Sequence, residues 1–414
     1  MREMRESGVE WIGEIPVSWQ ILTIGSVFKV RNEKVNDTDY PPLSVTKGGV
    51  VPQMENVAKS DANDNRKMVL SNDFVINSRS DRKQSCGVSP MDGSVSLINT
   101  VLYPANGAPV IPAYLNYLLK NYGFAEEFYR WGHGIVADLW TTRWQEMKSI
   151  LLPIPSMGEQ QQILEAISEK TDKVDTLIAN VEAQIEKLKD YKQSLITEVV
   201  TKGLDPTVPM KDSGVEWIGE IPAAWDTVRV KQLLRERKER SAEGKEEPLS
   251  MSQKVGLVPT KTLDAIPNPA SSYVGAKLAF VNDLVFNKLK AHLGVFSVSK
   301  YDGLVSPDYA VYYSTGVVDL KYLEYLFKTP QCISEFSKRS TGIAAGLTRL
   351  YTDGLFAIEC PLPPKDEQQA IVAYLDEKWT QIDRLIAIKQ AKIEKLEQYK
   401  RSLIYEYVTG KKEA

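Results

Sequence analysis

Basic side chains gather in two polar loops that occupy matching places in the chain. The first loop reads NSRSDRKQSCG and the second NKLKAHLG, and each follows an apolar run typical of a β-strand. Their basic residues are Arg79, Arg82, Lys83, Lys288, Lys290 and His292. Arginine and lysine bind phosphates, and arginine also pairs with guanine in the major groove of DNA. A nucleic-acid contact is one interpretation of these loops, and an ordinary solvated surface is the other.

Further basic residues stand beside a glycine turn or a polar turn after a predicted helix. These residues are Arg130, His133, Lys338 and Arg339, and the predicted DNA contacts are completed downstream by Arg143 and Arg349. With 51 Lys and Arg against 54 Asp and Glu, the net charge is −3, which excludes a basic coat over the whole surface. Any nucleic-acid contact must therefore be a local basic face.

The residues of common catalytic and metal sites are missing from the sequence. No P-loop, HExxH or GxSxG motif occurs, nor the Asp/Asn-Pro-Pro-aromatic tetrad of amino-methyltransferases that act on DNA. Cys86, Cys332 and Cys360 have no metal-ligand spacing. We therefore expect no catalytic residue, metal site or cofactor in this chain, and a role in binding or assembly. The scattered cysteines, the charged N-terminal segment and the lack of a long apolar run predict a cytoplasmic protein with no membrane span.

The chain is a tandem repeat. The decapeptide SGVEWIGEIP occurs at 7–16 and again at 213–222. MGEQQQIL at 157–164 matches KDEQQAIV at 365–372, and KLKDYKQSLITEVVT at 187–201 matches KLEQYKRSLIYEYVT at 395–409. Between these blocks the halves diverge, and SVFKVRNEKVNDTDY has no recognisable twin in RVKQLLRERKERSAEG. The pattern predicts a duplication, with halves 1–206 and 207–414. The matching blocks are expected to form the same framework in both halves, and the segments between them are expected to share a fold but differ in surface.

The kept C-terminal block of each half has the pattern of a long coiled-coil helix, at 159–202 and 367–409. Apolar residues recur every seven positions and predict the seam between two helices. These seam residues are Ile167, Val174, Val181, Leu188, Leu195, Leu375, Ile382, Leu396 and Leu403, with Lys389 interrupting the second series. Leu177, Gln184 and Tyr191 are expected to form the second row of the seam. The obvious partner of each helix is its own twin.

The changed parts are expected to be α+β domains. Short β-branched and aromatic runs alternate with turn residues, and each part has one clear helix. These helices are expected at 112–131 and at 318–339, the second with Pro330 interrupting it. The expected domains are 1–155 with the kept segment 7–19, the helix 156–206, 207–360 with the kept segment 213–225, and the helix 361–414. In the decapeptide, Trp11, Ile12 and Ile15 form an apolar stripe predicted to pack on the long helices.

The doubled order of blocks resembles the specificity subunit of type I restriction–modification enzymes. The residues that carry the resemblance are GVEWIGEIP at the start of each half, the Pro-rich runs LLPIPSMGEQQQI and CPLPPKDEQQAI, and the heptad helices that end in YKQSLITEVVT and YKRSLIYEYVT. The resemblance spans the whole chain. It implies two target-recognition domains held on an antiparallel coiled coil with pseudo-two-fold symmetry.

The resemblance also implies a non-catalytic function in DNA recognition. Each domain would read one half of a bipartite, asymmetric site on double-stranded DNA, and the coiled coil would set the spacer between the half-sites. Two methylation subunits and two restriction subunits would be the partners, and would hold S-adenosylmethionine, ATP and Mg²⁺.

Two other functions are compatible with parts of the sequence. One is a non-catalytic coiled-coil adaptor whose globular domains bind protein rather than DNA. The other is a self-sufficient methyltransferase, which the missing tetrad and cofactor loop disfavour.

Overall fold

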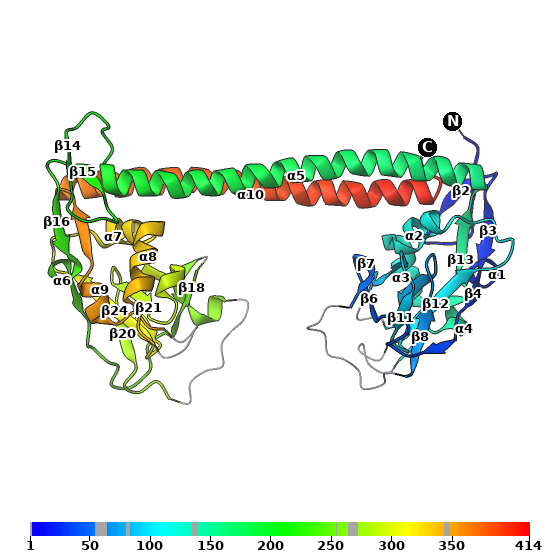
Figure 1. The fold of residues 1–414 in the computed structure, drawn as a ribbon, viewed down its shortest axis with the longest axis horizontal. Helices are drawn as coiled ribbons and strands as arrows, with labels where there is room; N and C mark the ends of the chain where they lie inside the picture. The colour runs from blue at the N-terminus through cyan, green and yellow to red at the C-terminus, as the bar shows by residue number, and fades with distance from the viewer. Residues whose placement is uncertain are drawn as a thin grey trace. The chain divides into compact units, whose positions relative to one another are not determined.

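The computed structural model describes residues 2–53, 64–79, 83–134, 140–253, 255–263, 272–342 and 348–414. Contacts divide the chain into two compact units, which are Met1–Glu182 with Gln390–Ala414, and Ala183–Lys389. Each unit holds one globular domain and a stretch of both long helices (Figure 1). No helix in the described parts of the chain is both long and apolar enough to cross a membrane.

The globular domain of the first unit is an antiparallel β structure with helices on one side. Its strands are β1 (Met4–Glu6), β2 (Glu14–Pro16), β3 (Gln20–Thr23), β4 (Phe28–Val30), β5 (Lys34–Val35), β6 (Leu43–Thr46), β7 (Gly49–Pro52), β8 (Arg66–Val69), β9 (Phe74–Asn77), β10 (Cys86–Val88), β11 (Gly93–Val95), β12 (Asn99–Pro104) and β13 (Leu151–Ile154). Its helices are α1 (Ile24–Val27), α2 (Pro112–Lys120), α3 (Tyr122–Arg130) and α4 (Trp144–Met147).

A four-stranded sheet in the order β10-β9-β12-β4 lies at the centre of this domain. Both of its faces are covered, which explains the continuous apolar run of β9. Phe74 and Ile76 pack with residues of α2 and α3, whereas Val75 packs with Val69 and Val95 from the smaller sheet β11-β8-β5. The loops at the Asn77 end of β9 are therefore mounted on a rigid, doubly covered strand.

The globular domain of the second unit has the same architecture. Its central sheet has the equivalent order β17-β24-β21-β22. Its strands are β14 (Met210–Asp212), β15 (Glu220–Pro222), β16 (Asp226–Arg229), β17 (Leu234–Glu236), β18 (Leu249–Ser252), β19 (Gly256–Pro259), β20 (Lys277–Ala279), β21 (Leu284–Asn287), β22 (Phe296–Val298), β23 (Gly303–Val305), β24 (Tyr309–Ser314) and β25 (Glu359–Leu362). Its helices are α6 (Val230–Leu233), α7 (Leu320–Phe327), α8 (Pro330–Arg339), α9 (Thr352–Phe356) and the 3₁₀ turns η3 (Thr260–Thr262) and η4 (Ala291–Leu293).

The single helix expected at 112–131 is wrong, because the segment forms two helices, whereas the interruption expected at Pro330 divides the second segment into α7 and α8. In the first domain the chain breaks at Asn121, whose side chain accepts a hydrogen bond from the Phe124 backbone N–H and so starts α3. In the second domain Thr329 caps α8 in the same way and Pro330 takes its first position. The break lets α2 and α3, and likewise α7 and α8, cover a wider area of the sheet than one straight helix.

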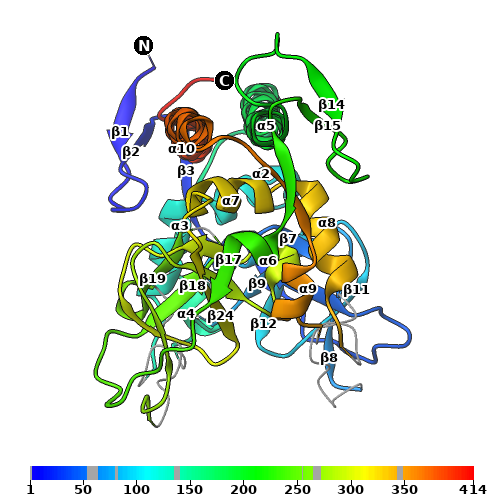
Figure 2. The same ribbon diagram turned by 90° about the vertical axis from the view of Figure 1, so that its left-hand side faces the viewer.

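The two long helices are confirmed. They are α5 (Met157–Lys202) and α10 (Lys365–Val408), each unbroken. In the first unit the beginning of α5 shares a core with the end of α10, through Ile163, Ile167 and Leu403. In the second unit the end of α5 shares a core with the beginning of α10, through Val200 and Ile371. The helices are therefore antiparallel, and Figure 2 views them nearly end-on, side by side.

The first row of the predicted seam is buried or half-buried, whereas the predicted second row is wrong. The residues of the first row are buried at Ile167, Val174, Val181, Leu375, Ile382 and Leu403 and half-buried at Leu188, Leu195 and Leu396. However, Leu177 and Tyr191 are 47% and 54% exposed. The true second row lies four residues after the first, at Thr171, Ile178, Ile185, Lys192 and Val199. On a helix, a residue is adjacent to the residues both three and four positions further along. The heptad spacing therefore does not show which of these two rows completes the seam.

One ion pair shows the internal symmetry of the helix pair. In the first unit the Lys400 ammonium lies 2.6 Å from the Asp175 carboxylate. In the second unit Lys192 lies 2.6 Å from Asp383. The repeat relates Asp175 to Asp383 and Lys192 to Lys400, so the same contact occurs once in each unit with the roles of the helices exchanged. Exposed pairs contribute at most about 1 kcal/mol, so these contacts set register more than stability.

The repeated decapeptide packs against the end of a long helix, as predicted. In the first unit Trp11, Ile12 and Ile15 are buried in the core that contains the end of α10, and the Tyr405 hydroxyl donates to the Trp11 carbonyl at 2.8 Å. α10 ends at Val408, and Gly410 follows with a φ of +75°. A Cβ at this position would clash with the Cδ of Pro16, so glycine lets the chain pass close to the decapeptide. Figure 2 shows the equivalent strands β14 and β15 of the second unit beside α5. Each decapeptide thus covers the end of the helix contributed by the other half.

A buried glutamine ties each globular domain to the start of its long helix. Gln160 is fully buried. Its amide donates to the carbonyls of Pro109 and Pro155 at 2.7 and 3.0 Å, and its oxygen accepts from the Ile111 N–H at 2.8 Å. Gln368 makes the same three kinds of contact in the second unit. This role explains why the EQQ motif stands at the start of both helices.

Candidate nucleic-acid interface

Four segments of the first unit meet at the end of β9. The Ser78 N–H donates to the Ile98 carbonyl at 3.2 Å, and the Ser78 carbonyl accepts from Thr142 at 3.0 Å. His133 and Thr141 exchange two backbone hydrogen bonds of 3.1 and 3.0 Å. We call this four-segment arrangement the junction. It brings the predicted residues Arg79, His133 and Arg143 to one part of the domain surface, although they are distant in the sequence.

The second unit repeats the junction bond for bond. The Lys288 N–H donates to the Asp308 carbonyl at 3.2 Å, and the Lys288 carbonyl accepts from Leu350 at 3.0 Å. Thr341 and Arg349 exchange two backbone hydrogen bonds of 3.0 and 2.9 Å. The predicted residues Lys288 and Arg349 therefore lie together. The same backbone arrangement carries different side chains in the two domains.

The predicted basic residues differ in how available they are. Eight of them are exposed: Arg79, Lys83, Arg130, His133, Arg143, Lys290, Lys338 and Arg339. Lys288, His292 and Arg349 are half-buried, and Arg82 lies outside the described residues. Arg130 pairs with Glu10 at 2.7 Å, and Lys338 and Arg339 both pair with Glu335. These three stand at helix ends beside acidic neighbours, which makes them weaker candidates for phosphate contact than the residues at the junction.

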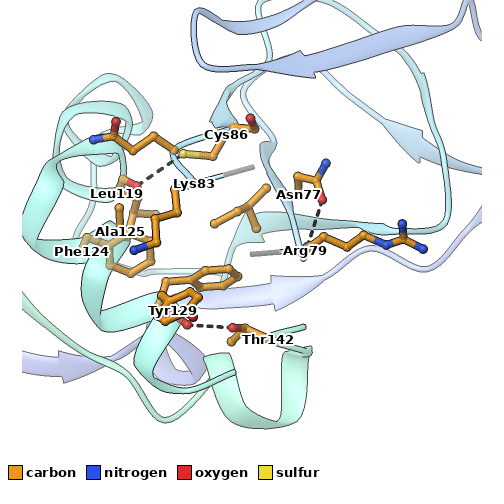
Figure 3. Close-up of a pocket in the computed structure, with 13 residues that line it drawn as sticks. Asn77, Arg79, Lys83, Cys86, Leu119, Phe124, Ala125, Tyr129 and Thr142 are labelled. Atoms are coloured by element: carbon orange, nitrogen blue, oxygen red, sulfur yellow. Dashed lines mark hydrogen bonds between the residues drawn. The ribbon is translucent and has the colours of Figure 1, made fainter. Parts of the chain in front are cut away.

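Lys83 is held on the side of the first domain, beside a narrow pocket. Its ammonium lies 3.0 Å from the Glu126 carboxylate. It also lies 4.3 Å from the centre of the Tyr129 ring, and Figure 3 shows both Lys83 and Tyr129 at the pocket. Trp140 stacks on Tyr129 with 5.6 Å between ring centroids. Burial raises the pKa of the Cys86 thiol, which lines the same pocket, to about 12, so that thiol is not a nucleophile near neutral pH.

One further pair of equivalent basic residues, Lys67 and Lys277, lies near the junctions and was missed in the sequence. The Lys67 ammonium donates to the Asn99 carbonyl at 2.6 Å, and Lys277 donates to the Tyr309 carbonyl at 2.5 Å. Burial lowers the pKa of both ammonium groups, and Lys288 lowers that of Lys277 further. Extending the weak match between NDFVIN and NDLVFN by five residues towards the N-terminus would have revealed this pair, since lysine stands at both places.

The absence of a twin for SVFKVRNEKVNDTDY is also corrected by the structure. Arg31 donates to both oxygens of the buried Asp73, at 2.7 and 3.1 Å. Arg237 does the same to Asp283, at 2.6 and 2.8 Å. In each unit the hydrogen bonds to the aspartate carboxylate raise the pKa of the arginine above its ordinary value, Asp73 acting on Arg31 and Asp283 on Arg237. These arginines stabilise equivalent parts of the two domains. Their guanidinium groups already bind buried carboxylates, so they are not available to a ligand.

Comparison with known proteins supports the resemblance inferred from the repeated blocks. No family model matches the chain. A putative type I restriction enzyme specificity subunit, MjaX of Methanocaldococcus jannaschii, is 25% identical over 97% of this chain and 95% of its own length. The MjaVIII specificity subunit of the same organism is 25% identical over 64% of this chain and 62% of its own length.

Solved structures share the fold. A chain from a study of complex assembly and conformational transition in a type I restriction–modification system matches with a TM-score of 0.67 and 16% identity, covering 95% of this chain and 98% of that one. The HsdS subunit of Thermoanaerobacter tengcongensis matches with a TM-score of 0.50 and 18% identity, covering 98% and 99%. Over its whole length, this chain is similar to the specificity subunits of type I restriction enzymes and has the HsdS fold.

Proposed function

We propose that this chain is the DNA-specificity subunit of a type I restriction–modification complex. Each globular domain reads one half of a bipartite, asymmetric site on double-stranded DNA. The observation that carries the proposal is the repeated junction, in which one backbone frame presents basic residues in both domains but different neighbouring side chains. Equivalent frames with different surfaces are what two different half-sites require.

The helix pair serves as the spacer between the two readers. The two helices exchange roles in its repeated ion pair, and a pair of readers with two-fold symmetry would suit the local two-fold symmetry of duplex DNA. Both helices continue without a break from one unit into the other, so their length is suited to determining the number of unread base pairs.

Exposed apolar side chains on the helix pair support docking of partner subunits. The register of the ion pair between Asp175 and Lys400 puts the exposed Leu177 and Tyr399 at nearly the same level along the helix pair in the first unit. The repeat puts Leu385 and Tyr191 at the equivalent level in the second unit, and both are exposed. Two equivalent apolar sites fit two copies of one partner, which we take to be the methylation subunit.

The remaining functions belong to the partners. Two restriction subunits join the full complex, and S-adenosylmethionine, ATP and Mg²⁺ are held by the methylation and restriction subunits. This chain itself carries out no catalytic step. The complex acts in the cytoplasm, where the DNA is.

The test is methylome sequencing of the host with and without this chain. We expect one bipartite motif to lose methylation when the chain is deleted and to regain it on complementation. An unchanged methylome, together with capture of a protein by the globular domains, would favour the adaptor function instead.

A further inference from the structure

The two junctions differ most clearly at two equivalent backbone positions. In the second unit these positions hold Asp308 and Arg349. In the first unit the position of Asp308 holds Ile98, which is exposed, and the position of Arg349 holds Thr141. The backbone hydrogen bonds are the same, so the difference lies in the side chains alone. On a duplicated frame that serves two different half-sites, such positions are where a difference in base preference is expected.

Arg349 is held at both its backbone and its guanidinium. Its backbone exchanges two hydrogen bonds with Thr341, and the next residue donates to the Lys288 carbonyl at 3.0 Å. Its Nη2 donates to the Asp308 Oδ1 at 3.2 Å. The Asp308 backbone is itself fixed by the Lys288 N–H at 3.2 Å. The guanidinium is thus oriented before any ligand arrives, which lowers the entropy lost on binding.

The guanidinium still has donors to offer. The side chains of Arg349 and Asp308 are 38% and 47% exposed. Arginine has five N–H donors in a planar fork, and the hydrogen bond to Asp308 uses one nitrogen. Guanine presents two acceptors, O6 and N7, at the spacing that such a fork binds in the major groove.

The carboxylate favours a base over a phosphate as the partner. A phosphate bound to Arg349 would bring its negative charge close to the Asp308 carboxylate, and like charges at such distances repel. A guanine edge is neutral and presents only acceptors. Lys288 and Lys277, which lie near Asp308, can meet the phosphates on either side without this conflict.

We propose that Arg349 reads a guanine in the half-site recognised by the second domain, with Asp308 as its positioning residue. This inference rests on the proposed function and deepens it. Lys290, an exposed residue two positions after Lys288, is expected instead to contact the DNA backbone and to carry no base preference.

The experiment uses the assembled complex of the full chain with its methylation subunits. The site found by methylome sequencing is made as a set of duplexes, each with one base pair replaced, and the Kd is measured for every duplex. For Arg349→Ala we expect the Kd of the intact site to rise about 5- to 150-fold, which is the 1–3 kcal/mol of a bidentate pair at 1.4 kcal/mol per decade. Discrimination should disappear at one G·C pair and remain at all others. Lys290→Ala should weaken binding to every duplex alike.

Two further arms test the chemistry and the positioning. Replacing that guanine by 7-deazaguanine removes the N7 acceptor, and should weaken binding by the unaltered complex but not by the Arg349→Ala complex. Asp308→Ala should reduce discrimination at the same base pair only, and should add nothing in the Arg349→Ala background. A purely structural role of Asp308 would weaken binding to all duplexes equally.

The outcomes separate this inference from the proposed function. If the unaltered complex binds no duplex in preference to others, the proposed function itself is wrong. If it binds its site but Arg349→Ala leaves all Kd values unchanged, or weakens all duplexes by one factor, Arg349 does not read a base.

Discussion

Replacing Val174 or Leu177 by aspartate tests the seam and the outer face of the helix pair with two changes only three residues apart. Val174 is 4% exposed in the seam of the first unit, whereas Leu177 is 47% exposed on the outer face. Val174→Asp removes a buried side chain, at a cost of about 1.5–3 kcal/mol. It also places a carboxylate between the helices, which adds several kcal/mol. Since a native protein has about 5–15 kcal/mol of stability, this variant should unfold at a much lower urea concentration.

Leu177→Asp should behave in the opposite way. Its side chain already faces water, so the free energy of unfolding should change by no more than about 0.5 kcal/mol. If Leu177 and Tyr399 form a docking site, however, the variant should bind fewer methylation subunits, as measured by analytical ultracentrifugation of the reconstituted complex. Leu177→Ala keeps the charge unchanged and serves as the control for repulsion by the new carboxylate.

A strongly destabilising Leu177→Asp would mean that the second row of the seam lies three residues after the first. A tolerated Val174→Asp would mean that the first row does not lie in the seam at all. Equal binding of methylation subunits by Leu177→Asp and the unaltered chain would move the docking site elsewhere.

Three further predictions concern the frame, the spacer and the first reader. Gln160→Leu should cost several kcal/mol in the free energy of unfolding, because three buried backbone groups lose their partner, and Gln161→Leu on the exposed side should be nearly neutral by the same urea titration. Seven residues inserted between 183 and 184, and seven more between 391 and 392, would preserve the heptad seam and lengthen both helices by about 10 Å. Methylome mapping should then find a spacer about three base pairs longer. An active complex with its original spacer would show that helix length does not determine the spacer. Arg79→Ala should weaken binding of the site by about 1–3 kcal/mol if it reads a base of the first half-site, and measurements on substituted duplexes should show no change in the second half-site.

The two long helices and the repeated decapeptides could be predicted from the sequence, because local patterns that occur in both halves specify them. The long helices follow from an unbroken heptad, and the burial of Trp11 and Ile12 follows from an apolar stripe. The break at Asn121 also has a local cause, since asparagine caps helices, but the apolar pattern on both sides concealed it.

The composition of the candidate interface could only partly be predicted. The basic residues of the two loops stand out by type, yet the loops meet their neighbours through hydrogen bonds between segments that are far apart in the chain. Ile98 and Asp308 lie next to Ser78 and Lys288 only because β12 and β24 fold back along β9 and β21. No local pattern marks such positions, since an exposed isoleucine in one half and an aspartate in the other do not look equivalent until the backbones are compared.

Exchange of one globular domain tests the central claim most directly. Residues 20–155 would be replaced by the first domain of another specificity subunit, and the methylated sites of the host would be mapped for both chains. Two independent readers on one frame predict that one half-site changes to that of the donor while the other half-site and the spacer keep their identity. A change of both half-sites together, or of neither in a complex that still methylates DNA, would contradict the account.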